Sequence, residues 1–229
     1  MTDYQDCIVT KPWGYEYLMY ESDKIGIWFL HIAEGRQTSL HCHPAKKTGY
    51  ILLSGEAEVS FLKDSTRLKA VSKLMIREGL FHSTKAISPG GIQVIEVETP
   101  PDKTNLVRLE DAYGRKDQPY EGSEAIVPVT TDCIMFQPPE QGNPVSYTVS
   151  GVTLVIERLE KLDVLKERPP EEVILVLDGG LVSKDRDPIL SSGDVITIST
   201  FTRLADTFSA PQGMSFMSVR QESTIPNEH

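Results

Sequence analysis

Short segments in which apolar and polar residues alternate recur along this chain, and they restrict its fold more than any other feature. The clearest is IQVIEVETP at 92–100, which alternates Ile and Val with Gln and Glu and ends at two prolines. The stretch TGYILLSGEAEVSFL at 48–62 contains two such segments separated by the turn pair Ser54-Gly55. A period of two is typical of β-strands with one buried face. Many short strands joined by Gly and Pro turns predict an all-β sandwich or barrel.

A second group of strand signals follows an irregular, proline-containing stretch between Lys116 and Asn143. Residues 157–167 fit a helix as well as a strand followed by a loop. The segment VILVLDG, which ends at Gly179, resembles YILLSG, which ends at Gly55, so the two halves look like weak repeats. We therefore expect two domains, at residues 1–118 and 119–229. The strand signals of the second domain lie at 145–160, 172–183, 193–200 and 214–221.

The charge and the cysteines of the chain bear on its partners and its compartment. The 229 residues include 23 basic and 33 acidic side chains, for a formal net charge of −10. Such a surface repels nucleic acids and anionic membranes overall, so we expect neither as a partner. The three cysteines form no CxxC pair, and the first residues have no signal-peptide pattern. These features favour a cytoplasmic protein. Apolar strands at both ends favour a homodimer.

Histidines concentrate in one part of the sequence. His41 and His43 have a single residue, Cys42, between them in TSLHCHPAKKTGY. Side chains at i and i+2 of a strand point to the same face, so the two imidazoles point together and Cys42 points away. His82 follows a glycine turn at the start of an expected neighbouring strand. Three imidazoles would bind one divalent transition metal, Zn, Mn, Ni or Fe. The alternative is a hydrogen-bonded polar cluster inside the barrel.

The spacing around these histidines resembles a known pattern. Gly35-x5-His41-x-His43-x4-Thr48-x6-Gly55 is similar to the first cupin motif, and REGLFHS, which contains His82, is similar to the second. The second half, with EVILVLDGG and SSGDVITIS, resembles the same motifs without histidine. The resemblance implies a bicupin: two tandem double-stranded β-helix (jelly-roll) barrels, of which the second is degenerate and only the first binds a metal. Thr48 stands where the motif carries a carboxylate ligand.

A narrower resemblance covers about residues 11 to 115. The segments KPWGYEYL, YILLSGEAEV, GGIQVIEVETP and NLVRLEDAYGR together look like the cupin module of type II mannose-6-phosphate isomerase. The resemblance implies a metal-assisted aldose–ketose interconversion in carbohydrate metabolism. It also implies that Arg115, which closes the D-x-YGR pattern, lies near the active site, with Asp111 and Tyr113 shaping the same turn.

Candidate substrate contacts surround the expected metal site. Lys46 and Arg115 are the candidate catalytic residues, and a guanidinium can bind a phosphate or carboxylate through two hydrogen bonds. The alternative for Arg115 is a structural salt bridge to Glu110 or Asp111. Gln93 is expected to face the barrel interior, by its alternation with Val94, and Glu96 is the other candidate on that strand. The expected substrate-binding residues are Lys47, Thr48, Tyr50 and Gln93.

The resemblance implies a metal-dependent cupin that acts on a sugar or sugar phosphate, by an isomerase- or epimerase-type reaction. A metal would polarise the carbonyl oxygen while a nearby group moves the proton. One alternative is a non-catalytic cupin that binds a sugar, which Thr48 favours. The other alternative is an Fe(II)-dependent oxygenase, which also uses a metal site with open positions.

Overall fold

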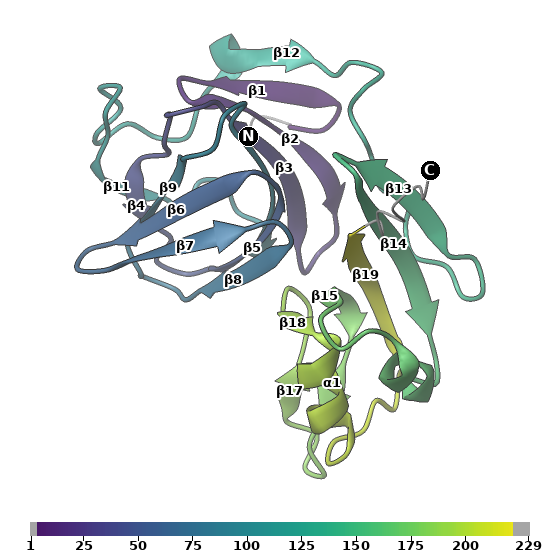
Figure 1. The fold of residues 1–229 in the computed structure, drawn as a ribbon. Helices are drawn as coiled ribbons and strands as arrows, with labels where there is room; N and C mark the ends of the chain where they lie inside the picture. Colours follow the sequence, from purple (N-terminus) through teal and green to yellow (C-terminus); the bar gives the residue numbers. More distant parts are fainter. Residues whose placement is uncertain (1–3, 222–229) are drawn as a thin grey trace, which may run out of the picture.

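Two antiparallel sheets form the N-terminal unit of the computed structural model, which describes residues 4–221 (Figure 1). The first sheet has seven strands, in the order β12-β1-β2-β3-β10-β5-β8. In that order they span Ile126–Pro128, Cys7–Lys11, Gly14–Glu21, Gly26–Ile32, Ile92–Thr99, Lys47–Ser54 and Ser72–Ile76. The second sheet has five, in the order β11-β4-β9-β6-β7. They span Val107–Glu110, Leu40–Cys42, His82–Ala86, Glu56–Phe61 and Ser65–Lys69.

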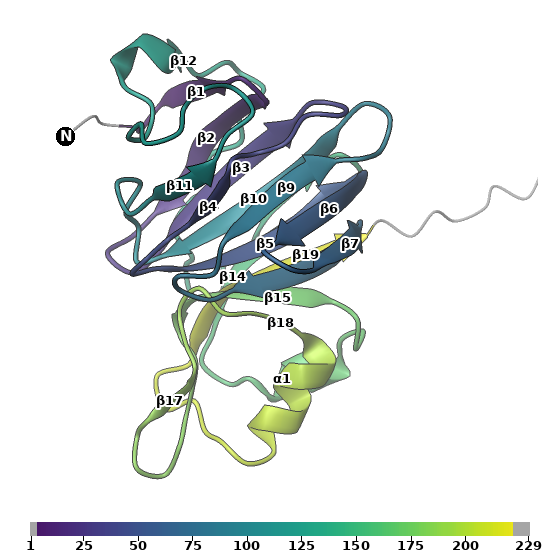
Figure 2. The same ribbon diagram turned by 90° about the vertical axis from the view of Figure 1, so that its left-hand side faces the viewer.

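The two sheets face one another around a common core, as Figure 2 shows. Trp28, Tyr50 and Val94 of the first sheet pack with Val59 and Ala86 of the second in one hydrophobic cluster. Two facing antiparallel sheets of this kind form the expected double-stranded β-helix. The all-β class predicted from the alternating segments is thereby confirmed.

The C-terminal unit is built on a five-stranded sheet in the order β13-β14-β19-β15-β18. Its strands span Val145–Val149, Val152–Leu159, Met214–Gln221, Val173–Gly179 and Val195–Thr197. The opposite layer consists of the short pair β16 and β17, at Leu181–Val182 and Pro188–Leu190, the 3-10 turn η2 at Asp163–Glu167 and the helix α1 at Ile198–Ala205. A further 3-10 turn, η1, spans Ser123–Ala125 in the N-terminal unit. Both layers of the C-terminal unit enclose a separate cluster that includes Leu165, Ile174 and Phe201.

One expectation for the C-terminal half needs correction, and the structure decides between two interpretations that the sequence left open. The strand expected at 193–200 ends at Thr197, where the side chain accepts a hydrogen bond from the N–H of Thr200 and caps α1. Ile198 and Phe201 are then buried on the inner side of that helix. The segment 157–167 is the end of β14 followed by η2, the second of its two interpretations.

The division into two domains at residue 118 remains a prediction, and the contacts favour a later boundary. The strand β12 pairs with β1, which places Pro128 opposite Cys7 in the N-terminal sheet. The segment up to Pro128 therefore belongs to the N-terminal unit by its hydrogen bonds.

Within residues 4–221, no helix is long and apolar enough to cross a bilayer.

The outer face of the seven-stranded sheet packs directly on the C-terminal sheet. Ile95 and Val97 of β10 lie in the same buried cluster as Leu154, Leu175 and Met217. A Cβ at Gly49 of β5 would lie 2.9 Å from Val195 Cγ2, so only glycine allows this close approach. The strands β3, β5 and β10 are consequently buried on both faces.

Because the two units share one core, we expect them to unfold together. Leu175 is 0% exposed and lies in the shared cluster. The substitution Leu175→Ala should therefore lower the unfolding free energy by about 2–5 kcal/mol. Leu62→Ala, at a position that is 60% exposed, is the control and should change stability by less than about 0.5 kcal/mol. Calorimetry should give one transition for both variants. Two separate transitions, of which only one shifts in Leu175→Ala, would contradict a shared core.

Candidate metal centre and the adjoining buried cavity

Three histidines from neighbouring strands converge inside the N-terminal unit. His41 lies in β4 and pairs in register with His82, the first residue of β9, while His43 follows the end of β4. The ring centroids are 4.9 Å apart for His41–His43, 4.5 Å for His41–His82 and 5.6 Å for His43–His82. One ring nitrogen from each residue lies within 4.8 Å of the other two. The structure thus brings together the three residues that were predicted from the sequence. Cys42, which lies between His41 and His43, is buried and has a free thiol.

Hydrogen bonds fix the orientation of each imidazole ring. The Nδ1 atom of His41 lies 2.8 Å from the carbonyl oxygen of Ser39. The Nδ1 atom of His43 lies 2.7 Å from the carbonyl oxygen of Asn105, and that of His82 lies 2.9 Å from the carbonyl oxygen of Leu80. A carbonyl oxygen only accepts, so each Nδ1 carries the proton and each Nε2 has a free lone pair. This is the arrangement that orients metal-binding histidines in proteins.

The Nε2 atoms of His43 and His82 are buried and have no hydrogen-bond partner. Buried polar atoms are almost always satisfied, because leaving one unpaired costs about 1–3 kcal/mol. Two such atoms beside a third imidazole therefore fit a divalent transition metal, which would take all three Nε2 lone pairs. A hydrogen-bonded polar cluster, the alternative interpretation, would have satisfied these atoms.

The three imidazoles are uncharged at neutral pH. Burial lowers the pKa of His43 to about 3 and the pKa of His82 to about 4. Burial, together with the neighbouring histidines, also holds the pKa of His41 well below its usual value. Neutral imidazole is the form that binds metals.

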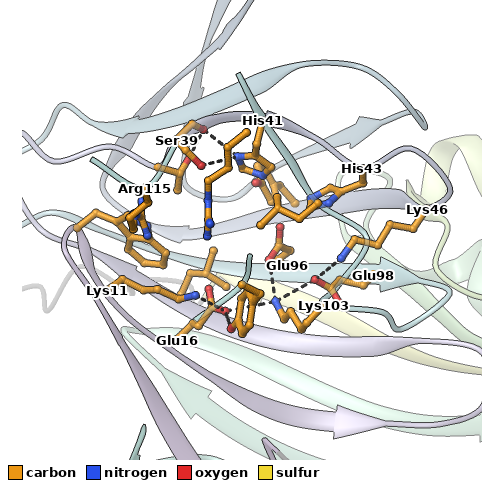
Figure 3. Close-up of a pocket in the computed structure, with 17 residues that line it drawn as sticks. Lys11, Glu16, Ser39, His41, His43, Lys46, Glu96, Glu98, Lys103 and Arg115 are labelled. Atoms are coloured by element: carbon orange, nitrogen blue, oxygen red, sulfur yellow. Dashed lines mark hydrogen bonds and ion pairs between the residues drawn. The ribbon is translucent and has the colours of Figure 1, made fainter. Parts of the chain in front are cut away.

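A network of buried charges lies beside His41 and His43 of the triad (Figure 3). Lys103, from the loop after β10, contacts Glu98 at 2.9 Å, Glu16 at 3.4 Å and Glu96 at 3.6 Å. Its Nζ also lies 3.8 Å from the centroid of the Trp28 ring. Lys46 contacts Glu98 at 2.8 Å.

The network continues from Glu16 toward the turn that contains Arg115. Lys11 contacts Glu16 at 3.4 Å and forms a second ion pair with Glu121. Arg115 contacts Asp111 at 2.7 Å and Glu121 at 2.6 Å. Asp111 also accepts the backbone N–H of Arg115 at 2.8 Å, so Arg115 forms the structural salt bridge that the sequence left open.

Glu16, Glu96 and Glu98 have different proton affinities although all three are buried. Burial raises the pKa of Glu96, and Lys103 offsets this only in part. Burial also acts on Glu98, but Lys103 and Lys46 outweigh it and lower the pKa. For Glu16 the effect of burial is outweighed by Lys103 and Lys11, and the pKa falls to about 2. Glu96 is thus the carboxyl group that most readily carries a proton.

His41 and His43 of the triad, together with the network, line a cavity of about 50 Å³. A volume of this size holds only a few water molecules. His41, His43, Lys46, Tyr50 and Arg115 line it, together with Glu96 and Glu98. A sugar would have to displace water and move at least one of these side chains.

Several predicted site residues lie elsewhere. Lys47 points to the seam between the units and contacts Asp194 at 2.6 Å. Gln93 lies on the outer face of its sheet, where it accepts a hydrogen bond from Ser150, so the expectation that it faces the interior is wrong. Even-numbered residues of β10 such as Val94 face the interior, and odd-numbered ones such as Val97 face the C-terminal sheet.

Two of the buried lysines, Lys11 and Lys103, and two of the glutamates, Glu16 and Glu98, were not predicted from the sequence. Glu98 could have been found, because it follows Glu96 by two residues in the same strand and must share its face. Lys11, Glu16 and Lys103 come from distant parts of the chain, and no local pattern distinguishes them from surface charges. Thr48, on the inner face of β5, is 1% exposed, and its hydroxyl has no hydrogen-bond partner.

Comparisons with known proteins find similar solved structures but no sequence match. The sequence matches no family model and no curated protein sequence. Among solved structures, it is similar to KdgF from Halomonas sp. (18% identity, 44% of this chain and 90% of the other, TM-score 0.39). It is also similar to a Klebsiella pneumoniae protein with a double-stranded β-helix domain (20% identity, 48% and 85%, TM-score 0.39). A third is a putative sugar phosphate isomerase from Acidithiobacillus ferrooxidans (17% identity, 34% and 52%, TM-score 0.32). The identities lie below 25% and the TM-scores below 0.5, so these likenesses say nothing about what the chain binds or does.

The low pKa of Glu16 predicts a specific dependence of stability on pH. The folded value of about 2 lies below the ordinary 4.5, so Glu16 stabilises the fold above about pH 4.5 and loses this contribution as the pH falls toward 2. When the pH is lowered from about 6 to 3, the unfolding free energy of Glu16→Gln should therefore fall by roughly 2 kcal/mol less than that of the wild type. Urea unfolding across this range is the measurement, with Glu78→Gln, in an exposed turn, as the control. Equal slopes for Glu16→Gln and wild type would contradict the assignment.

Proposed function

We propose that the N-terminal unit is a metal-dependent cupin enzyme that acts on a small sugar or sugar derivative by an isomerase- or epimerase-type proton transfer. The observation that carries the proposal is the set of three neutral imidazoles, two with unpartnered buried Nε2 atoms, beside buried carboxyl and ammonium groups. The metal, when bound, would supply a Lewis acid that polarises a substrate carbonyl. Zn, Mn, Ni and Fe remain the candidates, because imidazole suits all of them.

Glu96 is the best candidate to move the proton. It lies opposite Tyr50 in the ladder between β10 and β5, on the inner face of the barrel. A carboxyl group whose pKa is raised by burial exchanges a proton at neutral pH more readily than an ordinary glutamate. Tyr50 is fully protonated, because burial raises its pKa well above the usual value, so its hydroxyl can donate a hydrogen bond to a substrate oxygen.

The charges of the cavity favour a substrate without a phosphate group. Lys46 and Lys103 are paired with Glu98, and Arg115 is paired with Asp111 and Glu121. A phosphate would have to displace one of these carboxylates and leave it buried and unpaired, at a cost of several kcal/mol. Lys46 and Arg115 are therefore proposed to position the glutamates around the substrate. The narrower link to mannose-6-phosphate isomerase, the homodimer and the cytoplasmic location remain predictions.

A non-catalytic sugar-binding cupin is the second candidate. Thr48 in place of a carboxylate ligand and the cavity of about 50 Å³ favour it, because neither indicates turnover. The two candidates differ in proton transfer, which can be measured without knowledge of the product.

The metal site is tested by stability and metal content. Untagged protein should contain about one transition metal per chain. Metal at about 100 times its dissociation constant should stabilise the metal-free protein by about 2.7 kcal/mol, since it binds only the folded state. His82→Gln should lose both effects. His31→Gln is the matched control, because His31 lies on β3 outside the triad and should keep both. An unchanged melting temperature of wild type with every candidate metal would remove the proposal.

Proton transfer is tested by deuterium incorporation. The metal-loaded protein, incubated in deuterated water with aldoses, ketoses, uronic acids and their phosphates, should exchange the C–H next to the carbonyl of its substrate. NMR of the sugar reports this exchange directly. Glu96→Gln should lower the rate by roughly 10²–10⁴-fold while the metal content stays intact. Saturable binding of a sugar without exchange would favour the non-catalytic candidate.

A further inference from the structure

Several buried polar atoms without partners belong to the same part of the barrel interior. They include the Nε2 atoms of His43 and His82, the hydroxyl of Thr48 and Oε2 of Glu98. Thr48 and Glu98 are directly opposite one another in the ladder between β5 and β10. Both are on the inner, even-numbered face of their strands, the face that carries Tyr50 and Val94 into the core. Glu98 and His43 line the same cavity.

The carboxylate of Glu98 is held by one oxygen only. Its Oε1 contacts Lys46 at 2.8 Å and Lys103 at 2.9 Å, while Oε2 is unpartnered. Lys46 is anchored in turn, because its Nζ donates to the carbonyl oxygen of Asp102 at 2.8 Å. The group is thus fixed in orientation, with one buried acceptor oxygen left over, on a residue that lines the cavity.

The triad has no negative charge of its own. Three neutral imidazoles leave the full charge of a divalent cation uncompensated, and a buried charge without compensation is strongly unfavourable. Position 48 of β5, which follows the histidine pair, carries a hydroxyl. The buried carboxylate directly across the ladder from that hydroxyl is Glu98.

We propose that Glu98 supplies, from β10, the negative charge that the metal site lacks on β5. Its Oε2 and the Thr48 hydroxyl would hold, by hydrogen bonds, a water or a substrate hydroxyl beside the cation. Glu98 is in this sense a positioning residue rather than a fourth member of the histidine group. The inference rests on the proposed metal site, and it identifies the residue that sets metal affinity and holds the polar group next to the metal.

Glu96 provides a matched comparison two residues away. It is on the same face of β10, is equally buried and shares Lys103 with Glu98. It lies opposite Tyr50 rather than Thr48, and its oxygens are not among the fully buried atoms without a hydrogen-bond partner. A general effect of buried charge would therefore appear in variants of both glutamates, whereas the proposed role belongs to Glu98 alone.

The test is the affinity of the metal-free protein for Zn²⁺, measured by competition with a chromophoric chelator. Glu98→Gln should weaken binding by about 10–100-fold, the range found for groups that support metal ligands. Thr48→Val should weaken it less, and Glu96→Gln should leave it close to wild type. Glu98→Asp keeps the charge and should retain most of the affinity. Circular dichroism of each metal-free variant confirms that it is folded.

The outcomes separate this inference from the proposed function. If wild type binds Zn²⁺ and Glu98→Gln binds it equally well, the role of Glu98 is wrong and the metal site stands. Equal weakening in Glu98→Gln and Glu96→Gln also overturns it, since the effect would then be one of buried charge in general. If Glu98→Gln does not fold, the variants Glu98→Asp and Thr48→Val provide the test. Full loss of Zn²⁺ affinity in a folded Glu98→Asp variant, together with unchanged Zn²⁺ binding by Thr48→Val, would count against the role of Glu98. A wild type that binds no metal overturns both proposals.

Discussion

The antiparallel pairing of β5 with β10 is the constraint on which both the core and the site depend. This ladder sets Glu98 opposite Thr48 and Glu96 opposite Tyr50, and the strand period of two sends all four side chains into the barrel. The same period sends Ile51, Ile95 and Val97 to the other face, where they pack on the C-terminal sheet. A shift of one residue in this register would bury the apolar face in the cavity and expose the glutamates to the seam.

The C-terminal unit explains why strands of the N-terminal sheet are so apolar. Strands that are covered on both faces become nearly continuous hydrophobic runs, as in GIWFL and YILL, even though the sheet is antiparallel. The charged residues of β5 and β10 are Glu96 and Glu98, which face the cavity, and Lys47, which lies at the seam and pairs with Asp194. The covering sheet therefore excludes water behind the strands that carry Tyr50, Glu96 and Glu98. Burial acts to raise the pKa of both glutamates, and the close contacts of Lys46 and Lys103 with Glu98 separate the two values.

The sequence predicted the parts of this structure that depend on local spacing. His41 and His43 had to share a face, and a third histidine after a glycine turn was a sound candidate, because both inferences use neighbouring residues alone. The face of Gln93 could not be read in the same way, since IQVIEVET has apolar residues on both sides and either parity fits. The lysines of the buried network are brought in by tertiary contacts, between β1, the loop after β10 and strands far away in sequence. The helix α1 was missed because a threonine cap and a buried phenylalanine outweighed the β-branched run before it.

Two glutamates on one face of one strand can have different roles because their surroundings differ. Glu98 is bound by two ammonium groups that stabilise its charged form, so it is a poor proton acceptor and a good permanent charge. Glu96 shares a single lysine at a longer distance and is dominated by burial, which favours its protonated form. Pairs of carboxyl groups whose environments push their pKa values apart commonly divide acid–base work from charge stabilisation. In this cavity the division places the permanent charge opposite Thr48 and the mobile proton opposite Tyr50. A substrate held between the imidazoles and β10 would then meet both groups from one side.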